Sequence, residues 1–375
     1  MALDGKKLLR QESIVRRLHP ALQEVGLQVI PLHEAPLAEI AALIAAAWRH
    51  AYGNRIRIAF SPAFLRYCMG PAPARGFALT ARAEGALQGV ALGLPLDIYS
   101  GGEVREAILT TGLCVSAAWQ KRGLLELLML RHGIALLDAG MPCSFHWRAA
   151  KGQETRDAGD TLAHAVSTAL YAKALRLRLA ARLGNLNTSV MLGLGALNLA
   201  HDVRGVLDHI PRGTHFRQID SGNAETVVTL LNDASRGRNL SLVRTTERLV
   251  WDCTFDEDGI RGQGWVLLRG QQALAAAWGY TNPVSAAESY FSIDRIAFAD
   301  TLDERARRAF LARIEGDIRR KFNCFSVLMP GCVCDDLPER LGYRPVKTYY
   351  VGATETGFMP ELAPEALSGL PLPLR

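Results

Sequence analysis

The residues best suited to chemistry form a short polar turn between two apolar segments, Gln120-Lys121-Arg122-Gly123. The pattern of residues 107–115 predicts a strand before the turn, and that of residues 124–139 predicts a helix after it. A helix that begins after a glycine offers free backbone N–H groups, the positive end of its dipole and no Cβ to obstruct a ligand. Lys121 and Arg122 add positive charge. The turn therefore predicts a binding site for a diphosphate.

The elements that must position this turn follow a regular order. Alternating or apolar runs predict strands at residues 27–32, 77–83, 87–96, 107–115 and 143–147. Helical patterns occupy residues 38–50, 62–67 and 124–139. The predicted order is strand, two helices, three strands, helix, strand. After a polar stretch at 151–160, we expect a helix at 161–172 and strands at 175–179 and 188–194.

The second half of the chain repeats this order without repeating the sequence. Its predicted strands are residues 215–220, 264–269, 273–280, 290–298 and 324–329, and its predicted helices are 224–236, 246–251 and 302–321. The pattern is interrupted at residues 202–213. We therefore expect an α/β protein of two tandem domains, 1–205 and 206–375, each a central mixed β-sheet (α+β) flanked by helices.

The turn and the element order together resemble the GCN5-related N-acetyltransferases (GNAT). Motif A of that family reads Gln/Arg-x-x-Gly-x-Gly/Ala between the fourth strand and the third helix; Gln120 and Gly123 match, and Leu125 takes the last small position. The resemblance covers about residues 27–194. It implies that acetyl-CoA or another acyl-CoA is the cosubstrate. The residues implied in binding it are Leu113, Val115, Gln120, Lys121, Arg122, Gly123, Leu124 and Leu125.

The same resemblance implies catalytic roles for four residues. A backbone amide near Leu113 polarises the thioester carbonyl, and Tyr171, near the end of the predicted helix, protonates the departing thiolate as a general acid. Glu106 and His146 are the candidates for a base or water relay. Two alternatives stay open at this stage: Tyr171 as a core tyrosine, and His146 as a core histidine bonded to the backbone.

The second half ends in a segment similar to the family's Leu-Gly-Phe/Tyr-x-Pro-Val, namely Leu341-Gly342-Tyr343-Arg344-Pro345-Val346. Its equivalent of motif A, residues 299–303, has no glycine and contains Asp300 and Asp303, which repel a diphosphate. This predicts a degenerate domain without its own cofactor. The segment from Arg244 to Trp251 also resembles part of such second domains, although an ordinary amphipathic helix is the simpler explanation.

Charge and composition limit the remaining possibilities. Residues 1–205 hold 23 Lys and Arg against 15 Asp and Glu, and residues 206–375 hold 20 against 22. The basic first half suits an anionic ligand such as a nucleotide cofactor, or an acidic acyl-carrier protein. Neither zinc-ligand spacing nor an RNA-binding signature is present, so we expect no metal and no nucleic acid.

Cysteine usage and hydropathy bear on the compartment. Seven scattered cysteines favour free thiols, and residues 1–13 lack the apolar core of a signal peptide, which indicates a cytoplasmic protein. The apolar tracts 124–137 and 190–200 are too short to span a membrane. We expect the second tract to be buried rather than to touch a membrane surface.

These observations predict an N-acyltransferase that moves an acetyl or longer acyl group from CoA to a primary amine of a small molecule or peptide. Two alternatives remain. One is a catalytically silent binding or scaffold protein that keeps the fold. The other is an N-acyltransferase that takes its acyl group from an acyl-carrier protein. The sequence does not indicate the oligomeric state.

Overall fold

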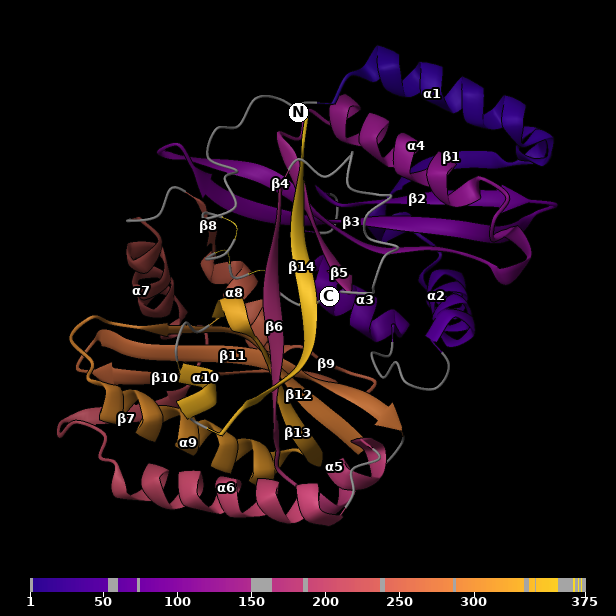
Figure 1. Ribbon diagram of the computed structural model, residues 1–375. Helices are drawn as coiled ribbons and strands as arrows, with labels where there is room; N and C mark the ends of the chain where they lie inside the picture. The colour runs from indigo at the N-terminus through magenta and orange to yellow at the C-terminus, as the bar shows by residue number, and fades with distance from the viewer. Residues whose placement is uncertain are drawn as a thin grey trace. The chain divides into compact units, whose positions relative to one another are not determined.

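The computed structural model of the chain describes residues 3–52, 60–72, 75–149, 164–184, 188–236, 240–285, 288–333, 337–340 and 342–356, with Leu367, Leu370 and Leu372. The chain forms two compact units (Figure 1). Unit 1 contains Met1–Val166 and Tyr350–Leu367, and unit 2 contains Ser167–Tyr349 and Ser368–Leu374. The boundary expected at residue 205 lies within unit 2. The polar stretch 151–160 lies outside the described residues.

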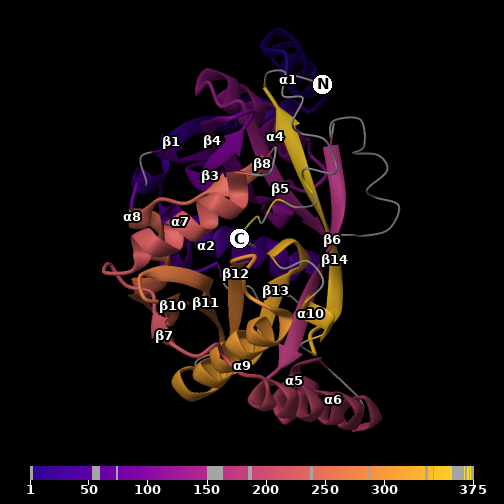
Figure 2. The same ribbon diagram turned by 90° about the vertical axis from the view of Figure 1, so that its left-hand side faces the viewer.

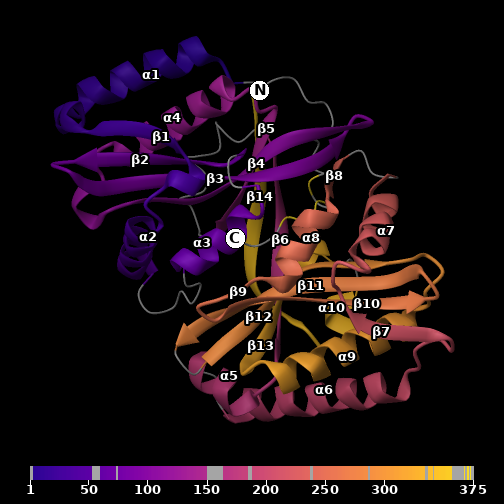
Figure 3. The same ribbon diagram turned by 180° about the vertical axis from the view of Figure 1, so that it is seen from behind.

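The sheet of unit 1 has the strand order β1-β2-β3-β4-β5-β14. Neighbouring strands from β1 to β4 are antiparallel, and β5 is parallel to β4. The strands are β1 (Gly26–Pro31), β2 (Phe77–Ala83), β3 (Ala86–Ser100), β4 (Glu103–Val115), β5 (Cys143–Ala149) and the last part of β14 (Arg344–Glu355). Helices α1 (Gly5–Leu18) and α4 (Leu124–Asp138) lie on one side of this sheet, and α2 (Leu37–Tyr52) and α3 (Pro62–Met69) on the other (Figure 3).

The sheet of unit 2 has the corresponding order β7-β10-β11-β12-β13-β6. Its strands are β7 (Thr214–Gln218), β10 (Ile260–Arg269), β11 (Gln272–Ser285), β12 (Glu288–Phe298), β13 (Cys324–Pro330) and β6 (His164–Ala174). Two short strands stand off this order, β8 (Leu240–Val243) and β9 (Asp256–Glu257), and β9 pairs with β10. Helices α7 (Ala224–Arg236) and α8 (Thr246–Thr254) cover one face, and α9 (Glu304–Lys321) covers the other (Figure 1). Helix α6 (Thr188–Leu207) packs on α9 and lies outside it. The remaining short helices are α5 (Leu177–Gly184) and α10 (Leu337–Arg340).

Both units confirm the predicted element order. In unit 1 the order is β1, α2, α3, β2, β3, β4, α4, β5, and in unit 2 it is β7, α7, α8, β10, β11, β12, α9, β13, apart from β8 and β9. In each unit four antiparallel strands are followed by one parallel strand after a helix. The α/β class with a central mixed sheet flanked by helices is confirmed.

Three predictions about the chain after β5 are wrong. The expected helix at 161–172 is strand β6, because pairing of its residues with β13 overrides the helical propensity of an alanine-rich segment. The expected strand at 175–179 begins helix α5; five alternating residues are too few to separate the two periods. The expected strand at 188–194 is the first part of α6, a helix of 20 residues.

A buried ion pair lies within unit 2, where β6 faces α9. Lys173 and Glu315 are 4% and 3% exposed, and Lys173 Nζ lies 2.5 Å from a Glu315 carboxylate oxygen. The same ammonium lies 3.3 Å from Asp202 of α6 and over the ring of Tyr343. Ionised groups in an apolar interior must be paired, so this contact fixes how α6 and α9 pack on β6.

Candidate functional site

The turn predicted to bind a diphosphate follows β4 in unit 1 and is held firmly at its start. Ser116 donates its backbone N–H to the carbonyl of Gln88 (2.8 Å) and its hydroxyl to the Gln88 side chain (2.7 Å). Trp119 packs against the core under α4, and the Arg122 guanidinium lies 5.8 Å from the Trp119 ring. Lys121 and Arg122 are exposed, so two positive charges stand in solvent beside the turn.

Gly123 begins α4 in the left-handed region, with φ of 77°. The first bond of the helix runs from the Leu127 N–H to the Gly123 carbonyl (3.0 Å). The N–H groups of the preceding helical residues therefore have no acceptor within the helix. Glycine also supplies no capping side chain. A helix N-terminus of this kind attracts an anion.

Leu124 and Leu125, the two predicted binding residues at the start of α4, differ in the exposure of their side chains. Leu124 is completely buried in the core, whereas Leu125 is 43% exposed. Leu124 can therefore reach a ligand only through its backbone N–H. The ring of His19, at the end of α1, lies directly against Gly123, at the place where a Cβ on Gly123 would stand. The sequence does not indicate His19, because the approach depends on how α1 packs beside α4.

Strand β4 runs beyond its pairing with β5 toward this turn. The pairs include Ile108 with Ser144 and Thr110 with His146, and β4 continues to Val115. The prediction places Leu113 in this last part of the strand.

A β-bulge lies in the same part of β4. Val90 of β3 pairs with Cys114 and Leu92 with Thr111, so two residues, Gly112 and Leu113, oppose one residue of β3. Gly112 has φ of 62°. Before the bulge, Ile108 packs against α4; after it, Leu113 and Val115 do so. The bulge therefore changes which alternate residues of β4 face α4.

The predicted base candidates lie at other places in unit 1. Glu106 is 2.9 Å from Arg75, whose guanidinium also contacts Asp97 at 2.5 Å. These two carboxylates raise the pKa of Arg75. His146 is half-buried on β5, and its ring lies against Gly352 of β14. The structure therefore does not place Glu106 and His146 together.

A histidine that the sequence analysis did not single out lies between α4 and β4. His132 is 7% exposed, and its Nε2 is 2.7 Å from the hydroxyl of Thr110, which pairs with His146 of β5. Burial lowers its pKa to about 4, so the ring is neutral at pH 7. Its Nδ1 is buried and has no hydrogen-bond partner within the described residues. The sequence does not indicate that His132 and Thr110 lie together, because the two residues meet only when α4 packs on the sheet.

Tyr171 lies in unit 2, on strand β6 rather than at the end of a helix. It pairs with Met329 of β13 and is half-buried, with its ring against Gly331. Burial and the charge of Glu339 raise the pKa of its phenol, which keeps the proton available at neutral pH. This is the protonation state that a general acid needs.

The helix of unit 2 that corresponds to α4 begins differently. Asp303 caps α9, and its carboxylate accepts a hydrogen bond from the Ala306 N–H at 2.8 Å. A negative charge thus already occupies the N-terminus of this helix. The carboxylates of Asp303 and Glu304 at this end of α9 oppose the binding of an anion, although Arg305 follows them.

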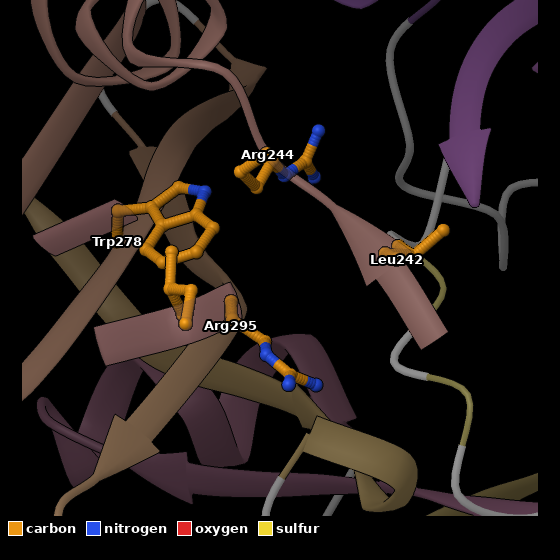
Figure 4. A pocket seen from close by; sticks show the side chains of 5 residues that line it. Leu242, Arg244, Trp278 and Arg295 are labelled. Atoms are coloured by element: carbon orange, nitrogen blue, oxygen red, sulfur yellow. The ribbon is translucent and has the colours of Figure 1, made fainter. Parts of the chain in front are cut away.

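A small pocket in unit 2 is lined by Leu231, Leu242, Arg244, Trp278 and Arg295 (Figure 4). The Arg244 guanidinium lies 5.8 Å from the Trp278 ring and 3.7 Å from the buried carboxylate of Asp252. The buried Nε1 of Trp278 has no hydrogen-bond partner among the described residues. Trp251, which the sequence analysis grouped with Arg244, packs instead on Phe255. Among the residues whose positions are described, no group of three or more His, Cys, Asp or Glu is placed to hold a metal ion.

Solved structures that resemble this fold include acyltransferases with the GNAT fold. A Saccharomyces cerevisiae N-myristoyltransferase with bound myristoyl-CoA matches with a TM-score of 0.65 and 11% identity, over 89% of this chain and 83% of that one. A GCN5-related N-acetyltransferase from Anabaena variabilis matches with a TM-score of 0.54 and 10% identity, over 88% and 73%. A probable N-acyltransferase from Enterococcus faecalis matches with a TM-score of 0.53 and 11% identity over the same shares.

The chain therefore has the GNAT fold in a two-domain arrangement. No protein-family model and no curated protein matches the sequence. At these identities the likeness concerns the fold, and the chemistry must be argued from the residues of this chain.

Proposed function

We propose that the protein is an acyl-CoA-dependent N-acyltransferase that uses the turn before α4 in unit 1 to hold the diphosphate of its cosubstrate. The observation that carries the proposal is the open N-terminus of α4 at Gly123, next to exposed Lys121 and Arg122 and just after β4. Amides, dipole and side-chain charge all favour an anion there. The structural neighbours support the same choice of donor, since one holds myristoyl-CoA.

The proposed chemistry is direct attack of a primary amine on a thioester. The backbone N–H near Leu113 donates to the carbonyl oxygen as negative charge develops on it. The phenol of Tyr171 donates its proton to the sulfur of the departing thiol. Glu106 and His146 stay candidates for removing a proton from the amine.

Unit 2 is proposed to bind no CoA of its own, because the carboxylate of Asp303 occupies the N-terminus of α9. Its proposed contribution is to the choice of acceptor, a small molecule or a peptide. Changes at Arg244 or Trp251 are expected to alter acceptor preference and to leave CoA affinity unchanged.

Titration calorimetry with CoA, acetyl-CoA and a long-chain acyl-CoA tests the proposal. We expect one equivalent per chain, and at least tenfold weaker binding in the Lys121→Ala/Arg122→Ala variant, since each exposed cation near a phosphate contributes roughly 1 kcal/mol. The matched control is Lys6→Ala/Lys7→Ala, which removes two exposed cations from the start of α1. Two equivalents per chain, or equal losses in both variants, would contradict the assignment.

Turnover separates the alternatives. A protein that binds CoA but transfers no acyl group to any of a panel of amines is a silent scaffold. Transfer from an acyl-carrier protein, without transfer from the matching acyl-CoA, identifies the carrier protein as the donor.

A further inference from the structure

Helix α6 of unit 2 is exposed to solvent along an apolar face. The sequence analysis expects residues 190–200 to be buried, and that expectation is wrong. Five large aliphatic side chains of this one helix are well exposed: Leu192 (66%), Leu197 (40%), Leu199 (66%), Val203 (50%) and Leu207 (69%). Soluble proteins rarely expose so many on one element unless it meets a partner.

The exposed side chains form a continuous stripe. Leu192, Leu199 and Val203 are spaced by seven and four residues, so they lie one above another on the helix, and Leu207 continues the row. The stripe runs from Leu192 to Leu207, about 22 Å of helix length. Gly193, Ala196 and Ala200 fill the space beside it without adding charge. This face is smooth and aliphatic over its whole length.

The other side of α6 explains why the stripe points away from the unit. Asp202 bonds to Lys173 and to Arg319 (2.9 Å), and Asp208 bonds to Arg308 at 2.8 Å. Gly205 packs against Ala312 of α9. Asp202 within the helix and Asp208 just after it therefore bond to residues of α9, and α6 forms the outermost layer of unit 2 (Figures 1 and 2).

The unpaired charges of α6 and of the segments that precede and follow it in the chain are positive. Residues 175–213 contain five arginines and two aspartates, and both aspartates are paired as described. Four of these arginines are exposed, and none pairs with a carboxylate among the described residues: Arg176, Arg178, Arg204 and Arg212. A helix with an aliphatic face and arginines beside it fits a surface that has an apolar interior and negatively charged groups at its boundary with water. The headgroup region of an anionic lipid bilayer has this character.

We propose that α6 binds the surface of anionic membranes, with Leu192, Leu199, Val203 and Leu207 inserted among the lipid chains and the surrounding arginines at the headgroups. The helix lies in the plane of the interface; none of the described helices is long and apolar enough to cross a bilayer. A second copy of the chain fits less well. In a two-fold interface the same patch meets itself, which brings Arg204 and its neighbours against like charges.

Vesicle co-sedimentation tests the proposal. We expect the protein to bind vesicles of phosphatidylcholine with phosphatidylglycerol, and to bind phosphatidylcholine alone at least tenfold more weakly. Leu192→Glu/Leu199→Glu lowers binding to the anionic vesicles at least tenfold, because it places charge in the apolar stripe. Arg176→Gln/Arg178→Gln reduces the preference for anionic lipid.

The matched control is Leu18→Glu, which changes a leucine of α1 that is 71% exposed on unit 1; it is expected to leave vesicle binding unchanged. If Leu192→Glu/Leu199→Glu lowers the melting temperature, the milder Leu199→Ser/Leu207→Ser serves in its place. Absence of vesicle binding, or binding that both stripe variants retain, overturns the proposal. So does a dimer, seen by sedimentation velocity, that the stripe variants abolish while vesicles leave it intact.

Discussion

Replacing Gly123 by alanine tests how the turn before α4 is built. Gly123 has φ of 77°, a region in which a residue with a Cβ loses about 1–2 kcal/mol. The new methyl group also overlaps the ring of His19, and overpacking of this kind adds about 1–3 kcal/mol. We therefore expect Gly123→Ala to lower the free energy of unfolding by about 2–5 kcal/mol in total. CoA affinity is expected to fall at least tenfold, because the strained residue shifts the backbone N–H groups that are proposed to hold the diphosphate.

Gly140 provides a matched control just beyond the other end of the same helix. Its φ is 64°, and nothing lies within 4 Å of a Cβ built on it. Gly140→Ala is thus expected to show the backbone strain alone, about 1–2 kcal/mol, with unchanged CoA affinity.

A third variant separates the two causes of instability in Gly123→Ala, the backbone strain and the overlap with His19. His19→Ala/Gly123→Ala removes the overlap, so its stability is expected to return to that of Gly140→Ala while CoA binding stays weak. Urea denaturation and calorimetry on the three variants give the two quantities. An unchanged CoA affinity in Gly123→Ala places the diphosphate elsewhere. Equal stability of the single and the double variant contradicts the role assigned to His19.

Four further changes test other parts of the structure. Tyr171→Phe is expected to lower turnover about 10²-fold at unchanged CoA affinity and melting temperature, measured by thiol release. The pKa of His132 is lowered to about 4, so as the pH falls the unfolded chain takes up a proton before the folded chain does. The free energy of unfolding is therefore expected to decrease by about 3 kcal/mol between pH 6.5 and pH 4. His132→Gln is expected to remove this pH dependence, as measured by urea denaturation. Lys173→Met leaves the buried carboxylate of Glu315 unpaired and is expected to lower the free energy of unfolding by about 3–5 kcal/mol. Lys173→Met/Glu315→Leu is expected to recover most of this loss. A double variant that is as unstable as the single variant contradicts the pairing. Asp303→Ala removes the N-cap of α9 and is expected to lower the free energy of unfolding by about 1 kcal/mol. Calorimetry is expected to show an unchanged CoA affinity.

Local patterns were enough to predict the strand, turn and helix around Gly123. The apolar run before it and the leucine-rich period after it are each carried by neighbouring residues. Helix α9 was predictable for the same reason, with Asp303 at its start and Arg319, Arg320 and Lys321 in its last turn. The element order of both units follows from such local signals.

Other features depend on contacts between distant residues and were missed. Residues 164–174 form a strand because β13 pairs with them, which the alanine-rich segment itself does not indicate. The contacts of His19 with Gly123 and of His132 with Thr110 arise only when helices pack. For α6, an apolar composition indicated burial, yet composition alone does not show which side of a helix the rest of the chain covers.

The bulge at Gly112 and Leu113 determines how the turn is aimed. In a regular strand the side chains at 108, 110, 112 and 114 would share one face. Here Ile108 and Thr110 share the α4 side with Leu113 and Val115, and a side chain at Gly112 would instead meet Ile44 of α2. Without this extra residue a regular strand would still carry Ile108, Thr110, Leu113 and Val115 on one face, so deleting Gly112 keeps all four on the α4 side. What the deletion removes is the local bend and added twist of the bulge, which set the direction in which β4 enters the turn. Loss of this one codon would thus leave the core under α4 in place and would change the direction in which the Gly123 amides point.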